Sequence, residues 1–189
     1  MTTWIKGRAL LAQAIDEKKV LFEDLEEKIT VRELSTVKGT AVYLARNLHG
    51  IPQVLINNLE HNRVVHERIV VLTVVIIEEP YVSRDSQHIK IKRFGSQGQF
   101  YRMKLYFGFK ESPDVRHALS LAAKEGLDLT GDDVSFFMGS ENISFKNRSK
   151  MPVWRRGLFL FLFHNASSSI NFFKVPVEKV LELGVRVEL

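Results

Sequence analysis

The sequence contains no cysteine, which excludes a disulfide framework and thiolate metal sites and is consistent with a reducing compartment. It also lacks an apolar run long enough to cross a bilayer. The longest run, Ile69 to Ile77, is about half of the roughly 20 residues that a membrane helix requires. No signal peptide is recognisable, because a polar, helix-like stretch begins almost directly after Met1. These absences predict a soluble chain.

Catalytic signatures are missing as well. The sequence has no Gly-x-Gly-x-x-Gly, no Walker phosphate loop, no Gly-x-Ser-x-Gly elbow and no His-Glu-x-x-His. Without a cysteine or a matching serine motif, covalent catalysis has no evident nucleophile. We therefore predict that the chain is not an enzyme, with no catalytic residue, no metal ligand and no cofactor.

The charge balance is basic. The 189 residues hold 27 Lys and Arg against 22 Asp and Glu, which gives a net charge of +5. Such an excess can favour an anionic partner, such as a nucleotide or an anionic lipid surface. Because the basic residues are spread along the chain, a dedicated nucleic-acid binder is not expected.

Hydrophobic patterning predicts an α/β fold with a mixed β-sheet and helices on both faces. Residues 1–38 are expected to form a helix, with Ile5, Ala9 and Ala12 on one side, and an irregular charged linker. Residues 39–189 are expected to form a single domain. Strands are predicted over 39–45, 69–77, two hairpin arms around 95–98, 134–138, 143–145 and 185–189. Helices are predicted over 4–18 and from Pro52, Pro113, about Pro152 and Pro176.

The predicted hairpin has a definite register. Pairing Ile91 with Met103 and Ile89 with Leu105 places the apolar residues of both strands on one face. The opposite face then carries cations and aromatic rings, which can hold phosphates while stacking a base, although a solvated hairpin face has the same pattern. These residues are Lys90, Lys92, Phe94, Phe100, Arg102 and Lys104.

The densest polar stretch, residues 57–68, runs from the end of a predicted helix into the central strand. Its Asn, His, Arg and Glu side chains either cap the helix and satisfy backbone groups, or contact a ligand or partner. In a third interpretation, His61 and His66 are metal ligands, but they lie five residues apart without supporting carboxylates. The stretch precedes its strand, whereas ligands of open α/β sheets favour the carboxyl ends of strands.

The stretch from Trp154 to Phe163 is apolar at nearly every position after Arg155 and Arg156. This pattern favours a buried core helix over an amphipathic helix at a membrane surface. The two arginines are expected at its exposed start.

Several stretches together resemble the C-terminal soluble region of the KUP/HAK/KT (Kup) family of potassium transporters. The resemblance runs in order through residues 39–189. Its blocks include Gly39-Thr40-Ala41-Val42-Tyr43-Leu44, His61-Asn62-x-Val64-x-His66-Glu67-Arg68, Tyr106-Phe107-Gly108-Phe109-Lys110-Glu111-Ser112-Pro113-Asp114, Trp154-Arg155-Arg156 and Glu182-Leu183-Gly184.

The resemblance implies a domain on the cytoplasmic face of the cell membrane, attached to a membrane part that takes up K⁺ together with H⁺. It implies no residue here for ion coordination. In Gram-positive members such a domain is a candidate receptor for cyclic di-AMP, and a two-fold ligand suits a homodimer. The alternative is a module that only dimerises or packs beneath the membrane part. Candidate ligand residues are His61, Asn62, His66 and Arg68, with Arg102, Arg155 and Arg156 as lesser candidates.

Overall fold

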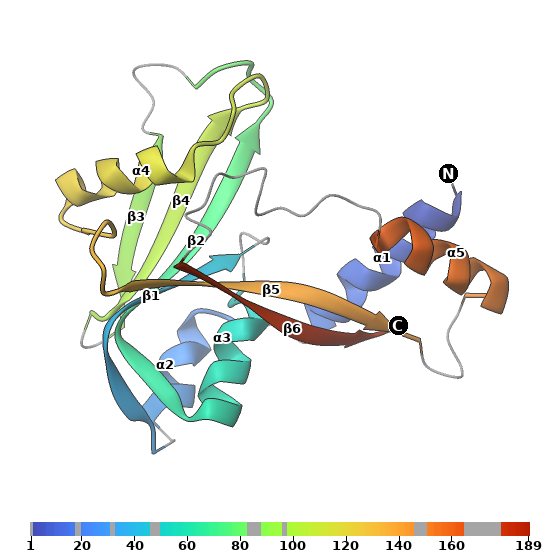
Figure 1. The fold of residues 1–189 in the computed structure, drawn as a ribbon, viewed down its shortest axis with the longest axis horizontal. Coiled ribbons are helices and arrows are strands. Elements are labelled where there is room, and N and C mark those ends of the chain that lie inside the picture. Colours follow the sequence, from blue (N-terminus) through green and yellow to red (C-terminus); the bar gives the residue numbers. More distant parts are fainter. Residues whose placement is uncertain are drawn as a thin grey trace. The chain divides into compact units, whose positions relative to one another are not determined.

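The computed structural model describes residues 2–17, 20–30, 33–45, 50–82, 88–95, 98–145, 151–164 and 179–189. Six strands form one sheet in the order β3-β4-β2-β1-β5-β6 (Figure 1). Parallel pairs join β4, β2, β1 and β5, whereas β3 is antiparallel to β4, so the predicted mixed sheet is confirmed. The strands are β1 (Ser35–Ala45), β2 (Val64–Ile77), β3 (Ile89–Phe94), β4 (Phe100–Gly108), β5 (Val134–Ser144) and β6 (Val180–Glu188).

Helices lie between and before the strands. They are α1 (Thr2–Glu17), α2 (Glu23–Thr30), α3 (Gln53–Asn57), α4 (Val115–Ala122) and α5 (Val153–His164), with a π-helical turn η1 (Asn58–Asn62) and a 3-10 turn η2 (Ala123–Glu125). The helix predicted from Pro176 lies outside the described residues. The chain divides into two compact units. Unit 1 comprises Met1–Lys19, Ser140–Ser168 and Gly184–Leu189, and unit 2 comprises Val20–Gly139 and Ser169–Leu183.

In unit 2, α4 covers one face of the sheet. Alternate residues of β2 and β4 point to this face because side chains alternate along a strand. Val70, Leu72, Met103 and Leu105 meet the apolar stripe of α4 there and are buried with it. The predicted stripe of Val115, Ala118, Leu119 and Ala122 is therefore confirmed, as is the stop at Gly126, whose φ of 83° suits glycine.

The opposite face of the sheet packs against α3 and η1. Pro52 precedes α3 as predicted, and Val54, Leu55 and Leu59 are buried. The expectation of an irregular linker up to residue 38 was wrong, because this stretch contains α2, whose Leu25 is completely buried. β1 also starts at Ser35, four residues before the predicted strand.

Two further boundaries differ from the prediction. β5 is one continuous strand, where two short strands around Gly139 were expected, because a glycine need not interrupt a strand. The helix predicted from Pro113 starts two residues later. Its N-cap is Asp114, whose carboxylate accepts a hydrogen bond from the backbone N–H of His117 at 2.9 Å.

The hairpin formed by β3 and β4 has the predicted register. Ile91 lies opposite Met103 and Ile89 lies opposite Leu105. The turn closes with a 3.0 Å hydrogen bond from the backbone N–H of Gly98 to the carbonyl oxygen of Gly95. Lys90, Lys92, Arg102 and Lys104 therefore share the face away from α4.

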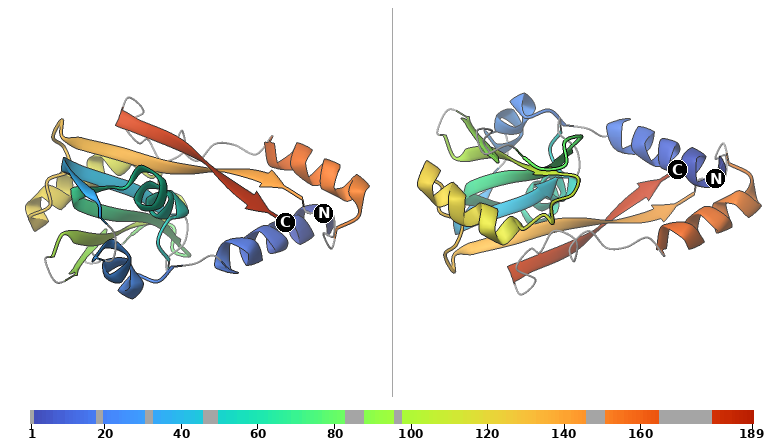
Figure 2. Two further views of the ribbon diagram at one scale, coloured as in Figure 1. Left: turned by 90° about the horizontal axis from the view of Figure 1, so that it is seen from below. Right: turned by 90° about the horizontal axis from the view of Figure 1, so that it is seen from above.

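Unit 1 is built on the contact between α1 and α5, which lie side by side in both views of Figure 2. The ring of Phe159 is fully buried next to Gly7, and rings of Trp4 and Phe145 lie 5.8 and 6.4 Å from it. α1 is helical as predicted, and Ile5, Ala9 and Ala12 lie on its exposed side, whereas Gly7 and Leu11 are buried. The outer side of α5 is exposed, although a buried core helix was expected.

Gly39 interrupts the pairing of β1 with β2, where the register shifts between Val37 and Thr40. Its φ is 95°, and a Cβ here would lie 2.5 Å from the carbonyl oxygen of Asp133. Gly39→Ala should therefore lower the free energy of unfolding by about 1–3 kcal/mol, measured by urea denaturation. Gly126→Ala is the matched control, because its φ is also positive but a Cβ there has no neighbour within 4 Å. Equal losses in the two variants would show that the close approach is unimportant.

Candidate functional site

The predicted site residues lie in three places. His61, Asn62, His66 and Arg68 lie in η1 and at the start of β2, Arg102 lies within β4, and Arg155 and Arg156 lie on α5 in unit 1. Arg68 is two residues from Val70 and shares its side of the sheet, the side of α4, whereas Arg102 alternates with Met103 and lies on the other side. Within unit 2 the structure therefore does not bring Arg68 and Arg102 together.

The η1 turn is held by a polar network whose members Tyr43 and Asn58 are buried and whose member Asn62 is exposed. The side-chain amide of Asn58 donates a 2.9 Å hydrogen bond to the hydroxyl of Tyr43, and Asn62 donates a 2.7 Å hydrogen bond to Asn58. Burial raises the pKa of Tyr43 to about 12, an effect that the bond from Asn58 partly opposes. Asn62 thus stabilises the turn, which favours the structural interpretation of this residue. His61 is exposed beside it.

The backbone of this turn has two uncommon features. A π-helical turn is rare in proteins and often occurs at functional sites. Arg63, which follows η1, has a left-handed backbone conformation with φ of 53°. Among the described residues, no other residue besides glycines has a positive φ. The two hydrogen bonds of Asn58 stabilise this junction.

His66 and Arg68 follow on β2. The His66 ring meets the edge of Phe137 at 5.8 Å, burial lowers its pKa, and its Nδ1 is buried without a hydrogen-bond partner. The guanidinium of Arg68 lies 3.7 Å from a carboxylate oxygen of Asp133. Hydrogen bonds from Thr130 lower the pKa of Asp128, and the charge of Arg68 contributes to this. Since carboxylates already face Arg68, it is a weaker phosphate ligand than the sequence indicated.

The four cations on the hairpin, Lys90, Lys92, Arg102 and Lys104, are named here the cation face. Lys90 lies directly opposite Lys104, and Lys92 lies directly opposite Arg102. Like charges in this position destabilise a sheet. Burial and the charges of Arg102 and Lys90 lower the pKa of Lys104. Within the residues that the structure describes, no carboxylate comes within ion-pair distance of these four side chains.

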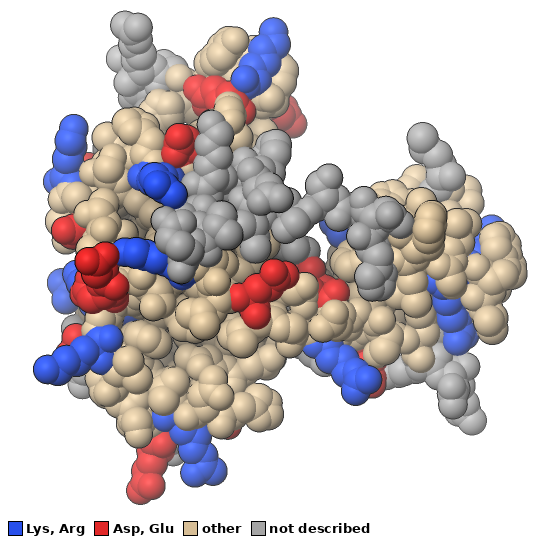
Figure 3. All heavy atoms as spheres, in the orientation of Figure 1, with Lys and Arg blue, Asp and Glu red and all other residues tan. Residues whose placement is uncertain are grey.

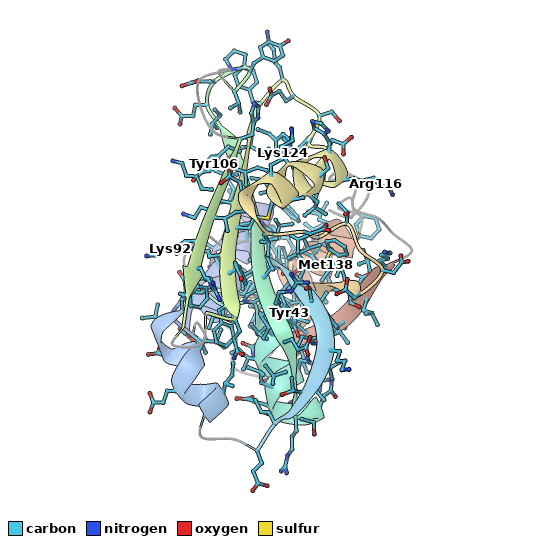
Figure 4. The ribbon with its side chains drawn as sticks, turned by 90° about the vertical axis from the view of Figure 1, so that its left-hand side faces the viewer. Tyr43, Lys92, Tyr106, Arg116, Lys124 and Met138 are labelled. Carbon is cyan, nitrogen blue, oxygen red and sulfur yellow. The ribbon has the colours of Figure 1, made fainter. Side chains whose placement is uncertain are left out.

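Aromatic rings surround the cation face. The guanidinium of Arg102 lies 4.7 Å from the ring centre of Phe22, and Phe22 meets Phe94 edge-on at 5.3 Å. The ammonium group of Lys90 lies 5.3 Å from the ring centre of Tyr106. Figure 4 shows Lys92 extending outward from the edge of the sheet. One guanidinium nitrogen of Arg102, Nη2, is buried and has no hydrogen-bond partner. An anionic group would satisfy it and offset the mutual repulsion.

The sequence prediction placed only Arg102 of this surface among the site residues. The register of the hairpin had already put Lys90, Lys92 and Lys104 beside it, so a signal for them was present. Phe22 and Tyr106 were missed. Phe22 is remote in sequence, and only the packing of the segment before α2 brings it over Arg102.

The remaining candidates lie on α5. The guanidinium of Arg155 lies 5.1 Å from the ring centre of Trp154. Arg156 donates a 2.6 Å hydrogen bond to the carbonyl oxygen of Met151 and lies 5.7 Å from the ring centre of Phe145. Arg156 therefore contributes to the structure of unit 1.

Two kinds of feature are absent from the described ranges. No three His, Asp or Glu side chains are grouped there as a metal ion would need, and so His61 and His66 gain no support as metal ligands. No helix in these ranges has the length and apolar content that crossing a bilayer requires.

Several proteins named as probable potassium transport system proteins are similar to this chain. A protein called "Probable potassium transport system protein Kup 2" from Chromobacterium violaceum is 38% identical over 189 residues, which is all of this chain and 30% of that protein. Proteins called "Probable potassium transport system protein Kup" from Azoarcus sp. and Pseudomonas aeruginosa are 36% and 37% identical, over all of this chain and 29% of each relative. No solved structure matches.

The chain spans about 30% of the length of these relatives. Residues 38–189 match the family model described as the K⁺ potassium transporter C-terminal domain. The chain therefore belongs to the family of C-terminal domains of Kup potassium transporters.

Proposed function

We propose that this chain is the regulatory domain of a potassium uptake transporter, and that an anionic ligand on the cation face controls uptake of K⁺ with H⁺ by the membrane part. The observation that supports this is the cation face itself. Four cations lie on two paired strands, and no carboxylate balances them within the described residues. Charges that repel one another are retained at a cost in stability, which a bound anion would offset.

Cyclic di-AMP is the candidate ligand. Its two phosphates need cations and its two adenines need stacking surfaces, and the cation face with Phe94 and Tyr106 supplies both kinds of group. A ligand with two-fold symmetry suits a homodimer of this domain. To regulate uptake, the ligand must bind the active and inactive conformations of the transporter with different affinity. We assign His61, His66 and Arg68 a smaller part in binding the ligand than the cation face. Arg68 in particular already faces the carboxylate of Asp133.

Calorimetric titration of cyclic di-AMP into the 189-residue chain tests the proposal. The chain should release or absorb heat with saturation in the micromolar range or below. Lys90→Gln combined with Lys92→Gln should weaken binding at least about tenfold, since both ammonium groups are exposed and hydrogen bonds to charged groups contribute about 1.5–3 kcal/mol each. Lys124→Gln, an exposed lysine on η2, is the matched control and should bind as the unchanged chain does.

Two results would contradict the proposal. No heat up to high micromolar concentration would remove cyclic di-AMP as the ligand. Unchanged affinity in the double variant would remove the cation face as its site. If light scattering then showed a dimer that forms without any ligand, the alternative of a module that only dimerises or packs beneath the membrane part would replace the regulatory function.

A further inference from the structure

The outer side of α5 carries an apolar stripe. Trp154, Leu158 and Phe161 follow one another at helical spacing on this side and are 65%, 42% and 66% exposed. Phe159, on the inner side, is fully buried against α1. The stripe as a whole, named here the α5 stripe, consists of Val153, Trp154, Leu158, Phe161 and Leu162.

Apolar groups in this number on one 12-residue helix are unusual for a surface that faces only water. Single exposed apolar side chains are normal, but a contiguous stripe with two large aromatic rings marks a contact surface. Figure 3 shows mostly uncharged side chains, with basic groups among them, at the position that α5 has in Figure 1. The α5 stripe therefore has the composition of a contact surface.

Unit 1, which contains this stripe, is basic. Its three segments hold 10 Lys and Arg against 4 Asp and Glu, and the cations Lys6, Arg8, Arg155 and Arg156 lie on α1 and α5. Both tryptophans of the chain lie here, each beneath a guanidinium group: Arg8 is 5.8 Å from Trp4, and Arg155 is 5.1 Å from Trp154. Tryptophan, arginine and apolar residues in combination are typical of protein surfaces at the boundary between lipid headgroups and acyl chains.

We propose that the α5 stripe docks unit 1 onto an anionic lipid surface, with α5 lying in the plane of the membrane interface. The apolar side chains would enter the boundary between headgroups and acyl chains, and the arginines would contact lipid phosphates. The charge disfavours a second copy of this chain as the occupant, because two cationic surfaces would face each other. The proposal needs no nucleotide and is independent of the regulatory function proposed above.

Vesicle binding by the 189-residue chain tests this surface. Vesicles of phosphatidylcholine mixed equally with phosphatidylglycerol should bind the chain at least about tenfold more tightly than vesicles of phosphatidylcholine alone, because each cation near an anionic surface strengthens binding severalfold. High salt should reduce the difference. Brominated lipids should quench the tryptophan fluorescence, and Trp154→Phe should remove most of the quenching, because Trp4 packs against Phe159 inside unit 1.

Two variants locate the contact. Leu158→Ser combined with Val153→Ser should weaken vesicle binding at least about tenfold and leave the thermal unfolding temperature nearly unchanged, because both side chains are exposed. Lys124→Gln, an exposed lysine of unit 2, is the matched control and should bind vesicles as before. Weaker binding by Lys90→Gln with Lys92→Gln, without a loss in the serine variant, would assign the lipid contact to the cation face and would overturn the proposal.

Three other outcomes would also overturn it. The first is equal binding to both kinds of vesicle, and the second is vesicle binding that the serine variants do not change. The third is a concentration-dependent dimer in light scattering that Leu158→Ser abolishes, because the occupant of the α5 stripe would then be a second copy of the chain. Should a serine variant unfold at lower temperature, the quenching of Trp154 in the unchanged chain decides, since it requires no substitution of an apolar residue.

Discussion

Phe159→Ala should destabilise unit 1 by about 3–5 kcal/mol, the usual loss for truncating a fully buried phenylalanine. The Phe159 ring fills the space above Gly7, where a Cβ would lie 2.2 Å from it, and touches the rings of Trp4 and Phe163. No small side chain can refill that space without moving α1. Both tryptophans lie in unit 1, so the fluorescence change during urea unfolding reports on this unit.

Leu158→Ala is the matched control, one residue away on the same helix. Leu158 is 42% exposed, so its truncation should cost less than about 1 kcal/mol. Similar losses in the two variants would show that α5 does not pack through Phe159. The pair also compares the two sides of α5, because Phe159 lies on the buried inner side and Leu158 on the exposed outer side.

The hairpin of β3 and β4 could be predicted in detail because its information is local. Apolar and cationic residues alternate on both strands, and only one register keeps them on separate faces. The central strand β2 was recognisable for a similar reason, since its run of β-branched residues fits a strand buried on both faces. The apolar stripe of α4 followed from helical spacing.

The features that were missed depend on contacts between distant residues. α2 is mostly charged, and its helical conformation is stabilised by burial of Leu25 in unit 2. The α5 sequence does not show which of its side chains face α1. Nearly every position after Arg156 is apolar, so no polar side marks the solvent-facing surface. Asp133, which partly neutralises Arg68, is far from it in sequence, so this contact could not be predicted. Because of it, the cation face is a better candidate site than the start of β2. Sequence patterns therefore predicted the elements better than the charge partners of the site.

Tyr43 should make the stability of unit 2 sensitive to alkaline pH. Its side chain is completely buried, its hydroxyl accepts the hydrogen bond from Asn58, and burial raises its pKa from 10.0 to about 12. In the unfolded chain Tyr43 loses its proton near pH 10, whereas in the folded chain it keeps the proton up to about pH 12. The unfolded state therefore binds fewer protons in this window, and the free energy of unfolding falls as the pH rises.

The size of the effect follows from the shift. Two pKa units correspond to about 2–3 kcal/mol, fully present below about pH 10 and lost as the pH rises through about 12. Tyr43→Phe removes this term, but it also leaves the buried amide of Asn58 without its acceptor, which costs about 1–3 kcal/mol at neutral pH. The unchanged chain should thus be the more stable of the two at about pH 8, and its advantage should shrink or vanish towards about pH 11.5.

Urea unfolding of both chains at each pH measures that advantage directly, because general alkaline effects on lysines are common to both and cancel in the difference. Tyr81→Phe is the matched control, since Tyr81 is exposed and losing its hydroxyl should leave stability nearly unchanged at neutral pH. If the difference in free energy of unfolding between the two chains stayed constant with pH, the folded chain would tolerate the ionised form of Tyr43. That result would contradict a raised pKa of Tyr43 in the folded state. A shrinking advantage would show that the hydroxyl of Tyr43 and the amide of Asn58 form a closed, buried pair that fixes η1 against the sheet.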